Sequence, residues 1–371
     1  MPQRPRVLLA GGGTGGHIFP NVAIVERLRE RGDRVDPLFM VSARPGDAAT
    51  LGRLELPFVA SCVQPLPGMR RPWRFVPFLW SWRRAVAEAV AVLQRERVAA
   101  VVATGGFVSG PALVAARKLG LPRAMVNLDA IPGKANLHLR RECTVVFSAY
   151  PTAALEGARV IGFPLRRASI GEGSRADARA ALGLDRDRPL LFVTGATHGA
   201  ESIIRAMMAF VGDRDGAAAL SSWQVFHQCG SFDVATLQRA YDDAGVQAKV
   251  VAFCDRMGAA WRAADLAISR AGAGSVAEAW ANATPSVFLP NPFHADGHQR
   301  ANVRPLVEAG GALVIDDLVD PVRNRELLGR TLIELLGDDA RRSHLHERLR
   351  ATAPPDGAEA VAAWIEATAA G

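Results

Sequence analysis

Short apolar runs alternate with longer stretches of helical periodicity along most of the chain. The runs are nearly continuous in Val, Leu, Ile and Phe, as expected for strands buried on both faces of a parallel sheet. We predict strands at Arg6–Ala10, Arg34–Val41, Val98–Thr104, Arg123–Leu128, Leu190–Thr194, Gln224–His227, Lys249–Phe253, Asp265–Ser269 and Ser286–Leu289, with helices such as Ile18–Arg31 and Gly199–Phe210 between them. This alternation predicts an α/β protein whose parallel sheets carry helices on both faces.

The strand series restarts after Gly162-Phe163-Pro164, which predicts two Rossmann-like halves. A length of 371 residues agrees with about two domains. We place a first domain at 1–163 and a second at 164–353, with an Ala-rich, charged helix over Ala168–Arg188 leading into the second sheet. The remaining segment, 354–371, opens with Pro354-Pro355 and predicts a final amphipathic helix, Ala358–Thr368.

Composition narrows the class of protein. With 49% hydrophobic and 22% charged residues, the chain has the balance of a globular protein. The 44 basic and 37 acidic residues give a net charge of +7, which suits a phosphate-bearing or anionic membrane partner. Four widely spaced cysteines predict free thiols in a reducing cytosol. No apolar run has the length of a spanning helix or a signal peptide core, so any membrane contact is expected to be peripheral.

A glycine-rich loop follows the first predicted strand, Gly11-Gly12-Gly13-Thr14-Gly15-Gly16-His17. Glycines allow a tight turn and close backbone approach, and the helix that follows offers N–H groups to a phosphate or diphosphate. The loop also satisfies GxGxxG, so a dinucleotide-binding dehydrogenase is an alternative. The second strand is followed by Ser42-Ala43-Arg44, without the acidic residue that binds the ribose of NAD. The dehydrogenase alternative is therefore weakened and is restricted to an NADP enzyme. His17 is either a general base or a polar helix-terminal residue.

Several further segments, in order along the chain, resemble the bacterial UDP-GlcNAc:lipid I N-acetylglucosaminyltransferases, the MurG family. The similar segments are Gly11–Pro20 (GGGTGGHIFP), Thr104–Pro111 (TGGFVSGP), Gly162–Arg166 (GFPLR), Gly195–Ala200 (GATHGA), Trp223–Gly230 (WQVFHQCG), Phe253–Met257, Ser269–Glu278 (SRAGAGSVAE) and His294–Gln299 (HADGHQ). Each motif alone is loose, whereas the ordered set, from about residue 6 to 368, is specific.

The resemblance implies a GT-B fold, in which two Rossmann-like domains face each other across a cleft and the last helix returns to the first domain. It also implies an inverting transfer of GlcNAc from UDP-GlcNAc to a polyprenyl-diphosphate-linked sugar, with no cofactor required. The acceptor-binding residues it implies are Gly13, Thr14, Gly15, Gly16, Gly105, Gly106 and Asn136. The donor-binding residues it implies are Arg166, Thr197, His198, Gly199, Phe253, Gly274, Ser275, Glu278, His298 and Gln299.

One motif departs from the family. The HEQN sequence expected after the fifth strand is replaced by Val126-Asn127-Leu128-Asp129, and only Asn136 is retained beyond it. Asp129 could accept a hydrogen bond from an acceptor hydroxyl or serve as a second candidate base, beside or instead of His17. The alternative is that it is the N-cap of a following helix. The departure leaves open a transferase with another lipid or glycan acceptor, and a non-catalytic scaffold that binds a UDP-sugar.

The donor side has local alternatives. Ser275-Val276-Ala277-Glu278 is a capping-box pattern, which competes with a role of Glu278 in binding the ribose hydroxyls. Arg166 is either a phosphate ligand or a surface arginine, and Phe253 either lies against the uracil or packs in the core. His294 and His298 lack a third ligand in register, and the Asp-x-Asp triplets lie in charged turns, so we predict no metal site.

Residues 66–84 combine five arginines, no acidic residue and five aromatic side chains. The aromatic residues are Trp73, Phe75, Phe78, Trp80 and Trp82. This composition is typical of a helix that lies in an anionic membrane interface. Core packing of Phe78 and Trp82 is the alternative, and no nucleic-acid motif accompanies the arginines. We expect a peripheral protein at the cytoplasmic face of the inner (plasma) membrane, with no nucleic-acid partner.

Overall fold

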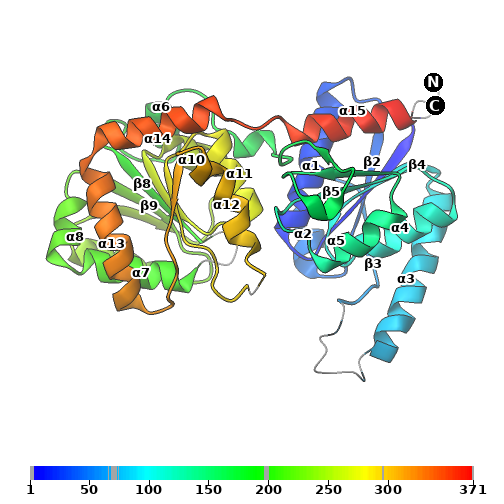
Figure 1. Ribbon diagram of the computed structural model, residues 1–371, viewed down its shortest axis with the longest axis horizontal. Helices are drawn as coiled ribbons and strands as arrows, with labels where there is room; N and C mark the ends of the chain where they lie inside the picture. The colour runs from blue at the N-terminus through cyan, green and yellow to red at the C-terminus, as the bar shows by residue number, and fades with distance from the viewer. Residues whose placement is uncertain are drawn as a thin grey trace. The chain divides into compact units, whose positions relative to one another are not determined.

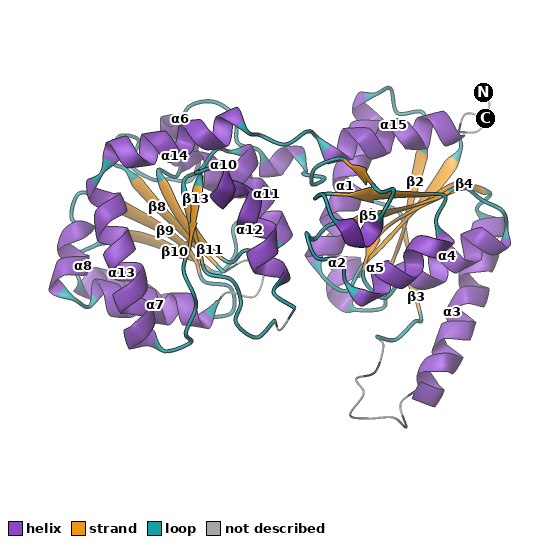
Figure 2. Ribbon diagram, viewed as in Figure 1, coloured by secondary structure: helices purple, strands orange, loops and turns teal. Residues whose placement is uncertain are grey.

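The computed structural model describes residues 4–65, 67, 73, 75–195, 200–294 and 296–369, except the side chain of Phe75. It divides into two compact units, the first made of Met1–Arg166 with Pro355–Gly371 and the second of Arg167–Pro354. Each unit is a parallel sheet between two layers of helices (Figures 1 and 2). Within the described residues, no helix is long and apolar enough to cross a membrane.

The first unit contains a seven-stranded sheet with the order β3-β2-β1-β4-β5-β6-β7. Its strands are β1 (Arg6–Gly11), β2 (Asp36–Ser42), β3 (Phe58–Ser61), β4 (Val98–Gly105), β5 (Arg123–Asn127), β6 (Val145–Ser148) and β7 (Arg159–Val160). Its helices are α1 (Gly15–Glu30), α2 (Pro45–Arg53), α3 (Phe75–Arg95), α4 (Ser109–Lys118), α5 (Lys134–Leu139) and α15 (Gly357–Ala369), with short 3₁₀ turns at Arg140–Glu142 and Ala153–Leu155.

The second unit contains a six-stranded sheet with the order β10-β9-β8-β11-β12-β13. Its strands are β8 (Leu190–Thr194), β9 (Gln224–Gln228), β10 (Gln247–Val251), β11 (Leu266–Ser269), β12 (Ser286–Phe288) and β13 (Ala312–Val314). Its helices are α6 (Arg175–Ala181), α7 (Glu201–Val211), α8 (Arg214–Ala219), α9 (Val234–Asp243), α10 (Met257–Ala263), α11 (Ala273–Ala281), α12 (His298–Glu308), α13 (Pro321–Gly337) and α14 (Asp339–Ala351), after a 3₁₀ turn at Arg167–Ser169.

Burial on both faces explains the apolar strands. In β1, Val7 and Leu9 belong to a core cluster with α1, α2 and α15, whereas Leu8 and Ala10 belong to a cluster with α3 and α4. The second sheet is likewise covered by α7, α9 and α13 on one face and by α6, α10, α11 and α12 on the other. The two Rossmann-like parallel halves expected from the pattern are therefore confirmed.

One predicted helix is wrong in extent. Instead of a continuous helix over Ala168–Arg188, the chain forms a short 3₁₀ turn and then only α6. Gly171 lies against α10, where an added Cβ would be 2.3 Å from Cβ of Arg262, and Ser174 caps α6 by accepting from the amide of Asp177. Packing and a new N-cap therefore divide the Ala-rich segment.

The last helix packs on the first unit. Val361 and Ile365 of α15 are fully buried with residues of α1. Arg27, only 1% exposed, donates from Nε to the Asp356 carboxylate at 2.7 Å and from Nη2 to the Leu165 carbonyl at 3.0 Å. A buried guanidinium requires such partners, and they fasten the segment before α15 to the end of the first unit.

Candidate functional site

The first glycine loop lies at the carboxyl edge of the first sheet, where the strand order changes direction between β1 and β4. Ligands of open α/β sheets bind at this point. Gly13 has a φ of +90°, which favours glycine, and α1 begins at Gly15 with Thr14 as an N-cap that makes no side-chain capping hydrogen bond. The predicted loop residues Gly13, Thr14, Gly15 and Gly16 thus form the turn into α1.

The second glycine loop, between β4 and α4, packs directly against the first. Gly105 and Gly106 have φ angles of +116° and +77°. A Cβ on Gly105 would lie 2.7 Å from Cδ2 of His17, and one on Gly106 would lie 2.4 Å from the carbonyl oxygen of Gly12. Both glycines are therefore required by close approach as well as by backbone conformation. The structure brings the two predicted glycine loops together around His17.

His17 is half-buried in the first turn of α1. Burial lowers the pKa of its imidazole from the usual 6.5, while the charge of Asp129, a backbone hydrogen bond with Gly12 and the charge of Asp47 act in the opposite direction. Nδ1 of His17 lies 3.3 Å from the hydroxyl oxygen of Thr14. An imidazole with a lowered pKa is neutral at pH 7 and therefore able to accept a proton.

Asp129 lies on the loop between β5 and α5. The N-cap interpretation is wrong, because α5 begins at Lys134 with Gly133 as its N-cap. The loop is held by Asn127, whose amide donates to the Asp129 carbonyl at 2.7 Å and accepts from Asn136 at 3.0 Å. Asn136, expected on the acceptor side, is thus bonded to the residue that replaces the family's glutamate. Asp129 is close enough to His17 for its charge to raise the imidazole pKa.

Arg166 is the last residue of the first stretch of the first unit. Its guanidinium lies over the ring of Phe19 in α1, 3.9 Å from the ring centroid. A cation–π contact at this distance holds the side chain in place. Arg166 is half-buried, and its predicted contact with phosphate stays a prediction.

Glu278 lies in the middle of α11, in the second unit. The capping-box interpretation is wrong, because α11 begins at Ala273 and its N-cap is Gly272, which makes no side-chain capping bond. The carboxylate instead accepts from the hydroxyl of Ser169 at 3.0 Å and from Nε1 of Trp261 at 2.9 Å. These contacts orient the carboxylate. The predicted Gly274 and Ser275 lie in the first turn of the same helix.

Among the other described donor-side residues, Phe253 lies on the loop after β10, and His298 and Gln299 lie in the first turn of α12. Phe253 follows β10 and is 59% exposed, so its interpretation as a core residue is wrong. Gln299 accepts from the Asn291 amide at 2.8 Å, which fixes the loop before α12. His298 has Nδ1 2.6 Å from Asp296 and Nε2 3.1 Å from Nδ1 of His294. Thr197, His198 and Gly199 lie outside the described residues.

His294 and His298 lie within contact distance of each other, as two metal ligands would. Among the residues that the structure describes, no group of three or more His, Cys, Asp or Glu side chains is arranged to hold a metal ion.

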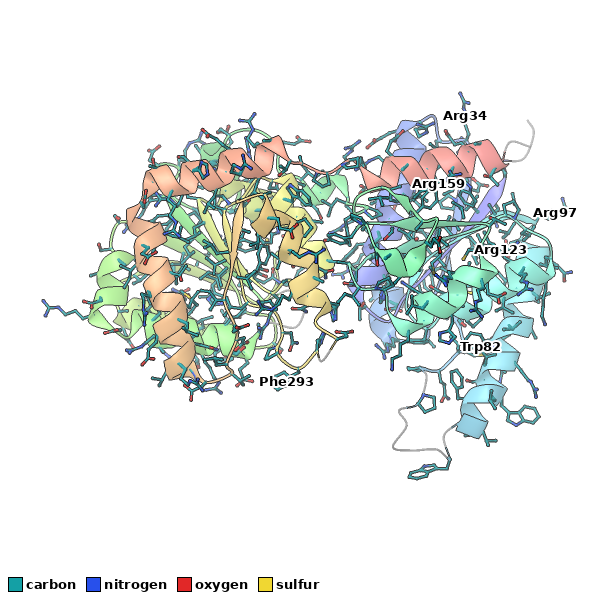
Figure 3. All side chains as sticks on the ribbon, in the orientation of Figure 1. Arg34, Trp82, Arg97, Arg123, Arg159 and Phe293 are labelled. Atoms are coloured by element: carbon teal, nitrogen blue, oxygen red, sulfur yellow. The ribbon has the colours of Figure 1, made fainter. Side chains whose placement is uncertain are left out.

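The predicted membrane residues differ in their exposure. Trp73 and Trp80 are 69% and 72% exposed, and Val76 and Leu79 on α3 are also exposed. The prediction that Trp82 faces the membrane is corrected, because its side chain packs against the core of the first unit (Figure 3). Its ring lies beside Gly110 of α4.

The two remaining predicted aromatic residues are Phe78 and Phe75. The Phe78 ring contacts Trp82 with centroids 6.0 Å apart, and Phe78 is half-buried. The side chain of Phe75 lies outside the described residues.

Two residues at these loops were missed by sequence reasoning. Asp47 of α2 is 4% exposed and accepts from the Gly13 amide, although no motif in the sequence singles it out. Arg270, inside the recognised SRAGAGSVAE segment, forms a 2.6 Å ion pair with the buried Asp317 and donates to Ser202 at 2.7 Å. Only the burial of these charges, which the tertiary structure creates, reveals them.

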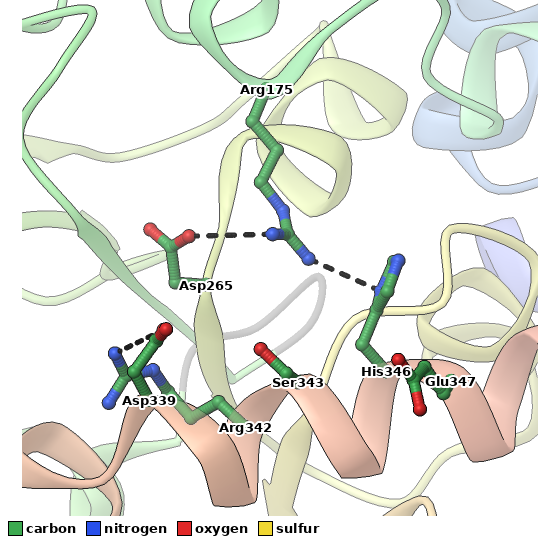
Figure 4. Close-up of a pocket in the computed structure, with 7 residues that line it drawn as sticks. All are labelled: Arg175, Asp265, Asp339, Arg342, Ser343, His346 and Glu347. Carbon is green, nitrogen blue, oxygen red and sulfur yellow. Dashed lines mark hydrogen bonds and ion pairs between the residues drawn. The ribbon is translucent and has the colours of Figure 1, made fainter.

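A polar cavity of about 140 Å³ lies between α6 and α14 (Figure 4). Its charged side chains pair with one another, as Arg175 contacts His346 at 3.2 Å and Asp265 at 3.8 Å. Asp265 directly precedes β11, so the cavity lies at the amino end of a strand, opposite to the edge where the predicted donor residues gather. We therefore do not assign the cavity to the donor site.

Comparisons with known proteins agree with this arrangement. The glycosyltransferase family 28 N-terminal domain matches residues 7–148, and the family 28 C-terminal domain matches residues 190–346. Two curated relatives are named UDP-N-acetylglucosamine--N-acetylmuramyl-(pentapeptide) pyrophosphoryl-undecaprenol N-acetylglucosamine transferase. The relative from a Nocardioides species is 39% identical over 84% of this chain and 85% of its own, and that from Clavibacter sepedonicus is 36% identical over 96% and 94%.

A solved structure is also similar. The crystal structure of Acinetobacter baumannii MurG covers 98% of this chain and 100% of its own, with a TM-score of 0.75 and 26% sequence identity. The similarity extends over both units and the final helix.

Proposed function

The chain belongs to the MurG family of glycosyltransferase family 28, and from this premise we propose that it transfers GlcNAc from UDP-GlcNAc to the lipid-linked sugar of lipid I, forming lipid II in peptidoglycan synthesis. The observation that carries the proposal is the identity of 36–39% with transferases of that name over 84–96% of the chain. The convergence of both glycine loops on His17 supports it independently.

In the proposed reaction, a hydroxyl of the acceptor sugar attacks C1 of GlcNAc. The bond from C1 to the UDP oxygen breaks, UDP leaves with the electron pair, and the configuration at C1 inverts. His17 takes the hydroxyl proton, and Asp129 acts beside it or instead of it. The lowered pKa of His17 supports this role, because the imidazole is neutral at physiological pH. Helix N-termini and Arg166 stabilise the leaving diphosphate.

The two ligands are assigned to different units. The acceptor diphosphate binds at the first glycine loop with Gly105, Gly106 and Asn136 nearby. The donor binds to the second unit, where Glu278 accepts from the ribose hydroxyls and Phe253 contacts the uracil. Gly274, Ser275, His298 and Gln299 line the rest of the donor site in that unit. Arg166, Thr197, His198 and Gly199 stay predicted contacts of the donor diphosphate.

The protein is assigned to the cytoplasmic face of the plasma membrane as a peripheral protein. Four exposed apolar side chains lie just before or within the first turns of α3, those of Trp73, Val76, Leu79 and Trp80. Their exposure supports insertion of this end of the helix into the lipid headgroup boundary. Neighbouring arginines would attract anionic lipids.

A transfer assay tests the proposal. Purified protein is incubated with radiolabelled UDP-GlcNAc and either lipid I or other polyprenyl-diphosphate-linked sugars in detergent. We expect label to pass to lipid I. Hydrolysis or transfer only with another acceptor would contradict the lipid I assignment, and binding of UDP-GlcNAc without turnover would indicate a scaffold.

A second candidate function, transfer to another lipid-linked acceptor, is favoured by one observation. Asn127 stands in place of the family's glutamate. Its side-chain amide donates to Asp129 and Ser148 and accepts from Asn136. The loop therefore presents a different set of polar groups to an acceptor sugar than HEQN does. The alternative acceptors in the transfer assay decide between the two candidates.

A further inference from the structure

The N-cap and the first turn of α2 hold Gly13 of the first glycine loop at both its backbone N–H and its carbonyl oxygen. The Gly13 amide donates to Oδ2 of Asp47 at 2.7 Å, and the Gly13 carbonyl accepts from Nη1 of Arg44 at 2.7 Å. The Arg44 guanidinium also lies 5.6 Å from the ring centroid of Phe107, in the second glycine loop. Arg44, which lies outside both glycine motifs, thus contacts both glycine loops.

Asp47 is constrained from several sides. Its Oδ2 also accepts from the Ser42 hydroxyl at 2.6 Å and from the Ser42 amide at 3.1 Å. The residue lies in the first turn of α2, where a negative charge is favoured by the helix dipole. At 4% exposure, it is a buried carboxylate whose bonds all run to the loop and to the end of β2. Gly12 packs closely against it, since an added Cβ would be 2.7 Å from Oδ2.

The occupied amide changes how an acceptor diphosphate must bind. Because the Gly13 N–H already donates to a carboxylate, it does not serve as a ligand for the diphosphate, contrary to a simple glycine-loop cradle. A carboxylate at this point would repel a phosphate that came too close. Gly13 therefore contributes the shape of the loop, and the amides at the start of α1 remain on the diphosphate side.

From this geometry we infer that Asp47 is a positioning residue for the acceptor side of the reaction, acting through the Gly13 turn and through His17. The inference rests on the proposed function. Two charged groups face His17, Asp129 on the β5–α5 loop and Asp47 on α2. The imidazole of His17 also has a hydrogen bond with the backbone of Gly12. Both carboxylates favour the protonated imidazole, so each helps His17 to hold the proton taken from the acceptor.

The test is Asp47→Asn in the full-length protein, with steady-state kinetics and NMR titration of the histidine rings. A His17→Gln variant assigns the His17 signal. We expect the KM for the acceptor to rise about tenfold, the scale of losing one charge-assisted hydrogen bond, with the KM for UDP-GlcNAc unchanged. The pKa of His17 falls further, because a charge that raised it is gone. An unchanged acceptor KM, or an unchanged His17 titration, overturns the inference.

Two further variants keep the outcome interpretable. Asp36→Asn removes one charge from the other end of β2, roughly 20 Å along the strand, and should leave both readouts unchanged. Should Asp47→Asn fail to fold, Ser42→Ala removes one of its hydrogen bonds and keeps the charge. It should raise the acceptor KM severalfold without moving the His17 titration, and an unchanged KM there overturns the inference.

The NMR arm separates this inference from the proposed function. If the wild-type protein transfers no GlcNAc to any acceptor, the proposed function fails. A lower His17 pKa in Asp47→Asn would still support the coupling between the two residues.

Discussion

At the residue scale, His17 and Asp129 illustrate how environment sets a role. His17 comes from the first turn of α1 and Asp129 from the loop after β5, and the charge of Asp129 acts on His17 because β1 and β5 end at the same edge of the sheet. Burial pushes the histidine pKa down while Asp129 pushes it up, so the imidazole is a stronger base than burial alone would allow. The pair therefore combines an acceptor of protons with a charge that stabilises the protonated form.

The pH dependence follows from the direction of the His17 shift. A base works in its deprotonated form, so activity is present above the His17 pKa and is lost as the pH falls through it. Because that pKa is lowered, we expect the acidic limb of the kcat/KM profile to lie below pH 6.5. An acidic limb above that value would argue against His17 as the base.

Exchanging Asp129 for asparagine separates its possible roles. If Asp129 is the base, Asp129→Asn should lower kcat by roughly 10²-fold or more with donor affinity intact. If it only supports His17, the acidic limb should shift to lower pH, since the charge that raises the His17 pKa is lost. Kinetics from pH 5 to 9 distinguish the two results. A neutral Asp129→Asn change beside an inactive His17→Ala protein would leave the base role to His17 alone.

Glu278 provides the donor-side prediction. Glu278→Ala should weaken UDP-GlcNAc binding by roughly 2–3 kcal/mol, the scale of a charge-assisted pair of hydrogen bonds. Isothermal calorimetry measures the change, with Glu308→Ala on α12 as a control at an exposed carboxylate. Because Glu278 also accepts from Ser169 and Trp261, a thermal melt must accompany the titration. Equal donor affinity in both variants would reduce Glu278 to a structural role.

At the element scale, α15 shows how a distant segment completes a domain. Its apolar side chains fill the core between α1 and the first sheet, and ion pairs of Arg31 with Glu359 and Glu366 lie at the rim. The rim pairs are partly exposed and contribute little compared with burial of the apolar face.

Truncating one buried side chain of α15 should destabilise the first unit. Ile365 is fully buried, so Ile365→Ala should cost about 2–5 kcal/mol of unfolding free energy by loss of transfer energy and formation of a cavity. Denaturant unfolding measures the cost. Ile333→Ala, at an isoleucine that is 43% exposed on α13, makes the same chemical change and should cost far less. Comparable costs at both positions would contradict the packing of α15.

Helix α3 combines core and surface functions in one element. Ala85, Ala89 and Leu93 bury one face against the first unit, while the first turns extend exposed apolar side chains. Composition assigned Trp82 to the membrane group, whereas its spacing of four residues from Phe78 favoured the core, and its packing beside Gly110 of α4 agrees with the core alternative. The membrane hypothesis therefore depends on Trp73 and Trp80.

At the scale of the whole molecule, the net charge of +7 and the exposed tryptophans should act together on a membrane. Replacing Trp73 and Trp80 by serine should reduce binding to vesicles containing anionic lipid, with the melting temperature preserved. Binding should also weaken as salt screens the basic residues. Cosedimentation with vesicles measures both effects, and Phe293→Ser, at an exposed aromatic residue of the other unit, is the control. Loss of the fold in the double variant would show that these tryptophans are structural.

The sequence by itself determined the features that depend on local pattern. Apolar runs located nine of the strands, because a strand covered on both faces must be apolar throughout. The glycines of both loops marked the turns at the carboxyl edge, and the ordered motifs identified the family. Short strands such as β3 and β7 were missed, since a few partly exposed residues at a sheet edge carry little pattern.

Only the tertiary structure decided the relations between distant residues. The hydrogen bond from Gly13 to Asp47, the contacts of Glu278 with Ser169 and Trp261, and the core position of Trp82 each join segments that are far apart in sequence. Local rules favoured a capping role for Glu278 and Asp129, because a carboxylate near a helix start usually caps it. The two helices begin elsewhere, at Ala273 and Lys134, with Gly272 and Gly133 as their N-caps. Which partner a buried carboxylate accepts from depends on packing across the sheet, and packing is not encoded in any single stretch of sequence.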